Sequence, residues 1–389
     1  MTPSQAPIDV VVVGSRPWPA ELPDDDLNLR TARALAERLG GRYDVIVPAG
    51  RARPGPVDRD PVHVHRVAAY SRPGFVLAAR RGLRALRERR GPGRRPHVLV
   101  SSDPLAALAV ESSRARRGRP HLVHIQGEVL TPGPGYGGPV KRWTLSAASR
   151  FVVRRANGVR VAGDDLRDAV ARLTSRPVAL IGDRVDTRLF TPAGGADGQA
   201  DQAASDAIMV GGLSSAKNHR AVVHAWARVV RTHPDAVLTI VGDGPRRSSL
   251  EALIKCLGLT DNVRLRGRVP QDHLVSLLRA ARCLLHASRT GRRPRAVLEA
   301  MSCGLPVVCS DIPGHREIVP PGTGLLVPPD DIAAWAGAIT TLLGDPGRAA
   351  AMGRAGRAYV VEHHDFETNI DRMADLIRRL SAAEPEPVR

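Results

Sequence analysis

Short runs of apolar, β-branched residues that end at a glycine recur in both halves of this chain. Residues 8–13 read IDVVVV before Gly14, and residues 236–241 read AVLTIV before Gly242. A continuous apolar run that stops at a turn residue is typical of a strand buried on both faces of a parallel sheet. Stretches with helical spacing, such as residues 28–39, separate these runs. The alternation predicts an α/β protein built on doubly wound parallel sheets.

The same pattern places the remaining elements. Further strands are expected at residues 43–47, 97–101, 121–125, 207–210, 263–265, 283–285 and 306–309, and further helices at residues 218–233, 295–303 and 362–380. Glycines and polar residues follow several of these strands, and in parallel sheets ligands bind at the carboxyl ends of the strands. The functional residues are therefore expected in the segments that follow the strands.

The length of 389 residues is too great for one typical core and suits two domains. The alternation of strands and helices restarts in the second half. We therefore expect two Rossmann-like domains, residues 1–182 and 183–389, facing each other across a cleft and joined near residues 180–192. The final helix, at about residues 362–380, is expected to pack back on the N-terminal domain. Residues 194–205 are small and polar and predict a surface loop.

The net charge of +18 lies mostly in residues 1–182, which carry 31 Lys and Arg against 16 Asp and Glu. Residues 80–96, RRGLRALRERRGPGRRP, are the densest part. Such a patch suits nucleic acid, an anionic membrane surface or an acidic acceptor. Aromatic residues make up only 3%, and no nucleic-acid-binding module is recognisable. A solvated helix face is the favoured interpretation, and nucleic acid is not an expected partner.

Several absences indicate the cytoplasm. The four cysteines show no C-x-x-C spacing, so neither a disulfide framework nor a zinc site is expected. The N-terminus lacks the basic leader of a signal peptide, and no apolar run approaches the about 20 residues that span a bilayer. Residues 24–26 contain a D-x-D, a metal–diphosphate signature in another fold, but here they favour a turn and a helix cap. We expect a cytoplasmic protein with at most weak peripheral contact at the inner face of the membrane.

Five stretches carry a resemblance that covers nearly the whole chain. They are GDRVDTRLFTP, VGGLSSAKNH, VGDGPRRSSLEAL, VRLRGRVPQDHLVSLLRAA and AVLEAMSCGLPVVCSDIPGHREIV. Their order and spacing resemble the retaining glycosyltransferases of the GT4 family, which have the GT-B fold. The resemblance implies a sugar transferase that uses a nucleotide-sugar co-substrate without a metal or other cofactor. The leaving diphosphate helps to deprotonate the acceptor in this family, so no protein nucleophile is expected.

The resemblance assigns roles position by position. Lys217 falls on the lysine that contacts the donor diphosphate and is the expected catalytic residue, because an ammonium can neutralise a leaving phosphate. Glu299 falls on the glutamate that holds the ribose hydroxyls. The remaining expected contacts are Gly14 for the diphosphate, Gly242, Arg268 and Val269 for the ribose and base, Pro294 and Arg295 for the donor sugar, and His124 and Glu128 for the acceptor. A packed strand histidine remains the alternative for His124.

Four departures from the family pattern concern the donor pocket. Gly212 replaces the arginine that partners Lys217, and Gly291 replaces the glutamate that holds sugar hydroxyls. Gln126 stands where a histidine usually faces the sugar, and Asp26 and Leu27 stand where a glycine pair is usual. Gln126 and Gly291 are nevertheless expected to line the sugar. Arg292 and Arg293 precede a helix start and are expected to supply the missing phosphate contact.

These departures suggest a rebuilt pocket and therefore an unusual donor sugar. We expect transfer from a GDP- or UDP-linked sugar to a small-molecule acceptor, an acidic compound or a thiol among them, in natural-product biosynthesis. A lincosamide-type octose passed to a small thiol is one such case. The alternatives are a cell-envelope glycan or lipid transferase at the membrane surface and an inactive GT-B scaffold. A phosphorylase that needs no nucleotide and a nucleic-acid binder are disfavoured.

Overall fold

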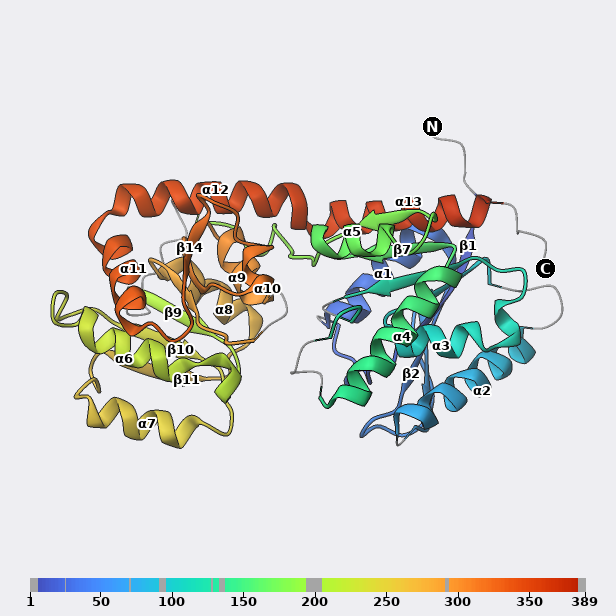
Figure 1. The fold of residues 1–389 in the computed structure, drawn as a ribbon, viewed down its shortest axis with the longest axis horizontal. Helices are drawn as coiled ribbons and strands as arrows, with labels where there is room; N and C mark the ends of the chain where they lie inside the picture. Colours follow the sequence, from blue (N-terminus) through green and yellow to red (C-terminus); the bar gives the residue numbers. More distant parts are fainter. Residues whose placement is uncertain are drawn as a thin grey trace. The chain divides into compact units, whose positions relative to one another are not determined.

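The computed structural model describes residues 6–24, 26–69, 71–90, 96–126, 129–132, 137–193, 205–290 and 294–383. It divides into two compact units, shown in Figure 1. The first combines Met1–Gly182 with Thr368–Arg389, and the second is Asp183–Glu367. Each is an α/β unit built around one sheet. Within the described ranges, no helix is both long and apolar enough to cross a membrane.

The first unit has an eight-stranded sheet in the order β3-β4-β2-β1-β5-β6-β7-β8. Its pairs are parallel except for the edge hairpin of β3 and β4. The strands are β1 (Ile8–Val13), β2 (Gly40–Pro48), β3 (Gly55–Arg59), β4 (Val62–Val67), β5 (Val98–Ser101), β6 (His121–Ile125), β7 (Gly158–Val161) and β8 (Val178–Leu180). The helices are α1 (Leu27–Leu39), α2 (Arg72–Arg90), α3 (Pro104–Glu111), η1 (Arg114–Arg116), α4 (Pro139–Arg155), α5 (Asp164–Ala171) and α13 (Phe366–Ala382).

The second unit has a six-stranded, wholly parallel sheet in the order β11-β10-β9-β12-β13-β14. The strands are β9 (Ala207–Val210), β10 (Leu238–Val241), β11 (Val263–Gly267), β12 (Leu284–His286), β13 (Val307–Ser310) and β14 (Gly324–Val327). The helices are η3 (Ser215–Lys217), α6 (His219–Val229), α7 (Arg247–Cys256), α8 (Gln271–Ala280), α9 (Arg295–Ser302), α10 (Pro313–Arg316), α11 (Ile332–Gly344) and α12 (Pro346–His364).

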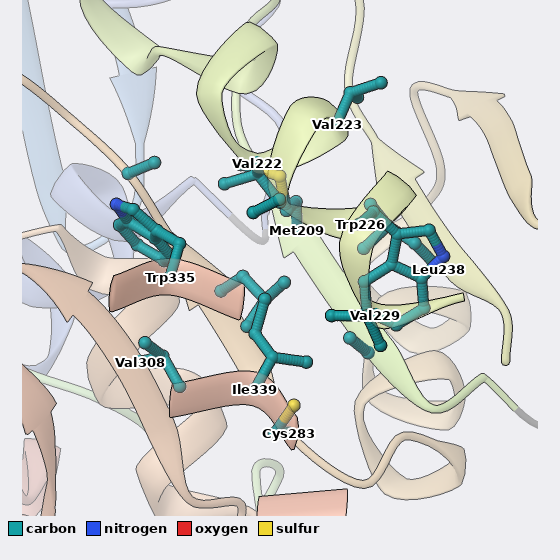
Figure 2. Close-up of a cluster of buried hydrophobic side chains, with 14 of the residues drawn as sticks. Met209, Val222, Val223, Trp226, Val229, Leu238, Cys283, Val308, Trp335 and Ile339 are labelled. Carbon is teal, nitrogen blue, oxygen red and sulfur yellow. The ribbon is translucent and has the colours of Figure 1, made fainter. Parts of the chain in front are cut away.

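Strand β9 is buried on both faces, as its apolar run predicts. Ala207 and Met209 point into one core, where Trp226 of α6 and Trp335 of α11 are fully buried (Figure 2). Ile208 points into a second core, which includes apolar residues of α8, α9 and α12. Alternate residues of a strand face opposite sides of a sheet, so each side needs its own helical cover. The doubly wound architecture inferred from the sequence is confirmed.

The final helix expected at about residues 362–380 is present as α13, but residues 362–364 belong to α12. The two helices are separated by a break at Asp365, whose ψ of 136° is not helical. Val185 causes the break by pairing with this residue: its amide donates to the His364 carbonyl, and its carbonyl accepts from the Phe366 amide, each at 2.9 Å. The linker between the units thus takes over hydrogen bonds that would have continued one helix.

Helix α13 packs against the first unit. Arg378 donates to the carbonyl of Arg38 at 2.7 Å. Leu380 lies so close to Gly158 that a Cβ on that glycine would be 3.1 Å from a Leu380 methyl carbon. The C-terminal residues 368–383 therefore complete the N-terminal unit, although residues 183–367 separate the two parts in sequence.

Two charged stretches behave largely as the sequence suggests. Asp26 caps α1 by accepting from two backbone amides, while Asp25 lies outside the described residues. Most arginines of α2 are exposed, as expected for a solvated face. Arg90 is the exception, because it is buried and pairs with Asp44 and, at 2.9 Å, with Asp9. One charge of the basic stretch is therefore structural.

Helix α12 makes a contact that only glycine permits. A Cβ on Gly353 would lie 1.9 Å from the carbonyl oxygen of Gly304. We expect Gly353→Ala to lower the free energy of unfolding by about 1–3 kcal/mol, because the helix must move off the turn beneath it. Chemical denaturation measures the change. Gly337→Ala in α11 is the matched control: its Cβ would meet nothing within 4 Å, so helix propensity should stabilise it by up to about 1 kcal/mol. Equal effects of the two changes would contradict the contact.

Candidate functional site

The strand order of the second unit reverses between β9 and β12. The chain runs from β9 outward through β10 to β11 and then returns to place β12 on the other side of β9. Connections that leave two adjacent strands in opposite directions open a crevice at the carboxyl ends, where ligands bind in such sheets. Most of the predicted donor residues follow the carboxyl ends of these strands.

Close backbone packing joins the ends of β9, β10 and β11. A Cβ on Gly242 would lie 2.0 Å from the carbonyl oxygen of Gly211, so no larger residue fits there. The Gly242 amide donates to the carbonyl of Gly267 at 2.7 Å. Arg268 and Val269 follow directly, and Val269 packs against the core. The structure thus brings Gly242 and the segment of Arg268 together at one edge of the sheet.

Gly212 follows β9 and has room for a side chain. The nearest atom to a Cβ on this residue would be the Asp243 carbonyl oxygen at 3.7 Å, an ordinary contact. The missing arginine is therefore not a steric requirement of the loop. Gly291, Arg292 and Arg293, which were expected to shape the same pocket, lie outside the described residues.

Lys217 ends the short helix η3 after β9, and its ammonium meets the end of β12. Its Nζ lies 3.3 Å from Nε2 of His286, the last residue of that strand. Burial lowers the pKa of Lys217 below its ordinary value of 10.5. Among the described residues no carboxylate forms an ion pair with this ammonium. A desolvated cation without a counter-ion, at the point where the strand order reverses, is suited to an anionic ligand.

The histidine beside Lys217 was not singled out from the sequence. His286 Nδ1 lies 2.9 Å from His315 Nε2, and His315 Nδ1 lies 2.6 Å from the carbonyl oxygen of Ser310. Both histidines are buried. The available signal was the position of His286 at the carboxyl end of an apolar strand, where ligands bind in parallel sheets. Nothing in the sequence places His315, 29 residues later, against it.

A second missed group holds the loop around Lys217. Asn218 adopts a left-handed backbone conformation with φ of 50°, and its Nδ2 donates to the Pro329 carbonyl and to Asp330. Arg289 donates twice to the same Asp330 oxygen, at 2.9 and 2.7 Å. The Arg289 amide also donates to the carbonyl of Ala216. The residues on both sides of Lys217 are therefore held by two other segments of the chain.

Glu299 lies in α9, four residues after Arg295 and one turn from the Pro294 cap. Burial raises the pKa of the Glu299 carboxyl, and the charge of Arg295 opposes this rise. The side chain of Arg295 is exposed. Within the described ranges, no hydrogen bond or ion pair joins Glu299 to Lys217. The structure thus places these two expected donor contacts on neighbouring segments, after β12 and β9, without direct contact.

The predicted residues of the first unit also follow strand ends. Gly14 follows β1, its amide donates to the Ile46 carbonyl, and a Cβ there would lie 3.1 Å from Ser102 Oγ. Gln126 follows β6 and is exposed, whereas His124 is half-buried within that strand. One strand, β5, separates β1 from β6. Glu128 lies outside the described residues.

A buried chain in the first unit has the composition of a nucleophilic triad but not its accessibility. His121 Nδ1 lies 2.6 Å from Glu111 and its Nε2 lies 2.7 Å from Ser101 Oγ. Burial opposes ionisation of Glu111, but hydrogen bonds and charges from His121 and Arg116 prevail and lower its pKa to about 2. Ser101 and His121 are fully buried, so no substrate reaches the hydroxyl. This network stabilises the unit.

The raised pKa of Glu299 predicts an effect on stability. Its folded pKa exceeds the unfolded value, so the folded state binds more protons and stability falls as the pH rises from 4.5 through the folded pKa. Glu299→Gln should remove this fall and raise the free energy of unfolding at pH 7. Denaturation series from pH 4 to 8 on both proteins test it. Glu251→Gln, at an exposed position in α7, is the control and should change little. A variant less stable than the parent at pH 7 would contradict the assigned environment.

Comparison with known proteins agrees with this geometry. The model of the family described as glycosyl transferases group 1 matches residues 197–359. The model described as glycosyl transferase 4-like domain matches residues 28–183. The two matches together take in most of both units.

Two curated relatives illustrate the range of the family. A GDP-mannose-dependent monoacylated alpha-(1-6)-phosphatidylinositol monomannoside mannosyltransferase from Corynebacterium glutamicum is 32% identical over 50% of this chain and 54% of its own. An alpha-D-kanosaminyltransferase from Streptomyces kanamyceticus is 27% identical over 62% of this chain and 64% of its own. The matches thus span between about half and two thirds of these relatives' length.

Solved structures match over nearly the full chain. Sucrose-phosphate synthase from Thermosynechococcus elongatus superposes with a TM-score of 0.78 and 21% identity, covering 96% of this chain and 99% of its own. HepE from Anabaena, solved in complex with UDP, superposes with a TM-score of 0.71 and 19% identity, covering 96% and 100%. At these identities the likeness concerns the fold alone. The family expected from the motifs is confirmed: the chain belongs to the GT4-type glycosyltransferases and has the GT-B fold.

Proposed function

We propose that this protein transfers a sugar from a GDP- or UDP-linked donor to a small-molecule acceptor with retention of the anomeric configuration. The observation that carries the proposal is the half-buried ammonium of Lys217, which lies at the reversal point of the second sheet without a carboxylate partner among the described residues. The named relatives include a GDP-mannose-dependent enzyme, and HepE was solved with UDP, so both nucleotides are candidates.

The proposed mechanism relies on charge and position. Lys217 stabilises the negative charge that develops on the departing diphosphate, so no metal ion is required for that role. Gly14 of the first unit gives the diphosphate close backbone access. Glu299 accepts from the ribose hydroxyls, because a carboxylate can bind two neighbouring OH groups. Gly242, Arg268 and Val269 contact the ribose and base.

The sugar and acceptor sites complete the proposal. Gln126, Gly291, Pro294 and Arg295 contact the donor sugar, and His124 and Glu128 contact the acceptor. With glycine at 291, no carboxylate there reads sugar hydroxyls, which favours a sugar with altered groups. The relative from Streptomyces kanamyceticus, by its name an alpha-D-kanosaminyltransferase, supports a natural-product setting. Natural-product biosynthesis is therefore the favoured setting.

A lipid acceptor at the membrane surface is the second candidate. Helix α4 exposes Val140 (76%), Trp143 (72%) and Phe151 (48%) near the exposed cations Lys141 and Arg150. An apolar stripe flanked by cations suits an anionic lipid surface. The mannosyltransferase relative acts, by its name, on a phosphatidylinositol monomannoside. Transfer to acceptors in anionic vesicles but not to water-soluble acceptors would select this candidate.

Nucleotide binding tests the donor site directly. We expect calorimetric titration with UDP, GDP, ADP and dTDP to show one preferred nucleotide. Lys217→Ala should weaken that binding about 10- to 100-fold, because a charge-assisted contact to phosphate is lost. Glu299→Ala should weaken it about tenfold through the ribose. Lys255→Ala, at an exposed position, is the matched control and should leave the affinity unchanged.

The outcomes distinguish three hypotheses: a transferase with this donor site, a donor site elsewhere in the protein, and an inactive scaffold. One preferred nucleotide with weakened variants supports the transferase, and a screen of sugars on that nucleotide then identifies the donor. Binding that is indifferent to Lys217 and Glu299 would move the donor site elsewhere. No binding by any nucleotide would favour an inactive GT-B scaffold and direct attention to a protein partner.

The space at Gly212 allows the family's missing arginine to be restored. We expect Gly212→Arg to tighten binding of the preferred nucleoside diphosphate about tenfold, since a guanidinium beside Lys217 adds a second phosphate donor. Gly212→Ala, which adds only an uncharged methyl group at this position, should bind as the parent does. If Arg292 or Arg293 already provides this contact, as we propose, removing it should enlarge the gain from Gly212→Arg. An unchanged affinity in Gly212→Arg would show that residue 212 does not face the phosphate.

A further inference from the structure

Three hydrogen bonds run in series from Lys217 into the core of the second unit. Lys217 Nζ lies 3.3 Å from His286 Nε2, His286 Nδ1 lies 2.9 Å from His315 Nε2, and His315 Nδ1 lies 2.6 Å from the carbonyl oxygen of Ser310. The chain links η3 to the ends of β12 and β13 through α10. It starts at a residue expected to bind donor phosphate and ends at a backbone group that cannot titrate.

The backbone carbonyl at the end of this hydrogen-bonded chain fixes which nitrogen carries the proton in each histidine. A carbonyl oxygen only accepts, so His315 must donate from Nδ1 to Ser310. In neutral His315 the other nitrogen then accepts, so His286 must donate from its own Nδ1. The Nε2 of neutral His286 is left as an acceptor, which an ammonium can satisfy. We propose that His286 and His315 are positioning residues that orient the ammonium of Lys217 toward the donor diphosphate through this one-directional chain.

The surroundings keep both histidines neutral. Burial lowers the pKa of His286 well below 6.5, and the charge of Lys217 lowers it further; burial and Lys217 act in the same direction on His315, although its bond to Ser310 opposes them. His219, the first residue of α6, also faces this group, and burial lowers its pKa to about 4. Charged residues on the neighbouring segments pair with each other: Arg289 with Asp330, and Arg316, which follows His315, with Asp311. A neutral imidazole can hold an ammonium without neutralising it, so the full positive charge remains for a phosphate.

This inference deepens the proposed function and rests on it for the identity of the ligand. It also predicts a pH dependence. Burial lowers the pKa of Lys217, so the ammonium is lost at a lower pH than that of an exposed lysine, and diphosphate affinity should fall as the pH rises through that value. Removing the acceptor at His286 should lower the pKa of Lys217 further, because the charged form loses its hydrogen bond.

The test begins without any ligand. The chain has three lysines, Lys141, Lys217 and Lys255, so lysine labelled with ¹³C at Cε gives three signals whose pH titrations can be followed separately by NMR. Lys141 and Lys255 are exposed and serve as internal references. We expect the pKa of Lys217 to lie below the ordinary lysine value of 10.5. Long-range ¹⁵N spectra of labelled histidines should show His286 and His315 neutral at pH 7 with the proton on Nδ1.

Variants separate orientation from general support of the fold. His286→Phe keeps an aromatic ring but offers no acceptor. It should lower the pKa of Lys217 and weaken UDP or GDP binding about 10- to 100-fold. His286→Gln, whose amide both accepts and donates, should restore most of both. His315→Phe should act in the same direction, and adding it to His286→Phe should change nothing more, because its effect passes through His286. His364→Phe is the matched control: this buried histidine bonds the Asp183 carbonyl and should affect stability alone.

Each result decides for or against the hydrogen-bonded chain from Lys217 to Ser310. A proton on Nε2 of His286, a cationic His286 or His315 at pH 7, or an unchanged Lys217 titration in His286→Phe would overturn it. Additive effects of His286→Phe and His315→Phe would overturn the link between them. If no nucleotide binds the parent protein but the tautomers and the titration are as expected, the proposed function fails and the hydrogen-bonded chain stands. If a nucleotide binds but the histidine tautomers differ from those expected, the proposed function stands and the hydrogen-bonded chain fails.

Discussion

The parallel pairing of β9 with β12 is the contact on which the candidate site depends. Because β10 and β11 are added on the other side of β9, the connections after β9 and β12 leave the sheet in opposite directions. Lys217, from the first connection, then reaches the end of the second strand at His286. Glu299 enters through the helix that follows β12. A different strand order would put these residues on separate parts of the sheet.

Two buried histidine networks show how neighbouring charge decides a role. His121 bonds Glu111, whose ionised form is stabilised by His121 and Arg116, so this network is charged, internally matched and closed to ligands. His286 instead bonds Lys217 and another histidine, and no carboxylate balances the ammonium among the described residues. The first network satisfies itself and stabilises a fold. The second leaves a positive charge that no carboxylate of the described residues balances, which suits an anionic ligand.

Much of the fold was predictable because buried parallel strands have a strong local signature. The runs at β1, β9 and β10 were located from their apolar character, and the family motifs placed Lys217 and Glu299 after the correct strands. The break at Asp365 was not predictable, because its cause is Val185, far earlier in the chain. The role of Arg90, in α2, was hidden for the same reason: its partners Asp9 and Asp44 come from strands β1 and β2.

The sequence by itself determined the alternation of buried strands and helices, the two-unit organisation of the family and the residue types at the strand ends. These are local properties, since periodicity and turn residues act over a few positions. Only the tertiary structure decided that Gly242 must pack on Gly211 and that Lys217 has a neutral imidazole, and no carboxylate among the described residues, as its partner. Such contacts join residues 31 to 69 positions apart, and burial, which sets their charge states, exists only once the sheet has formed.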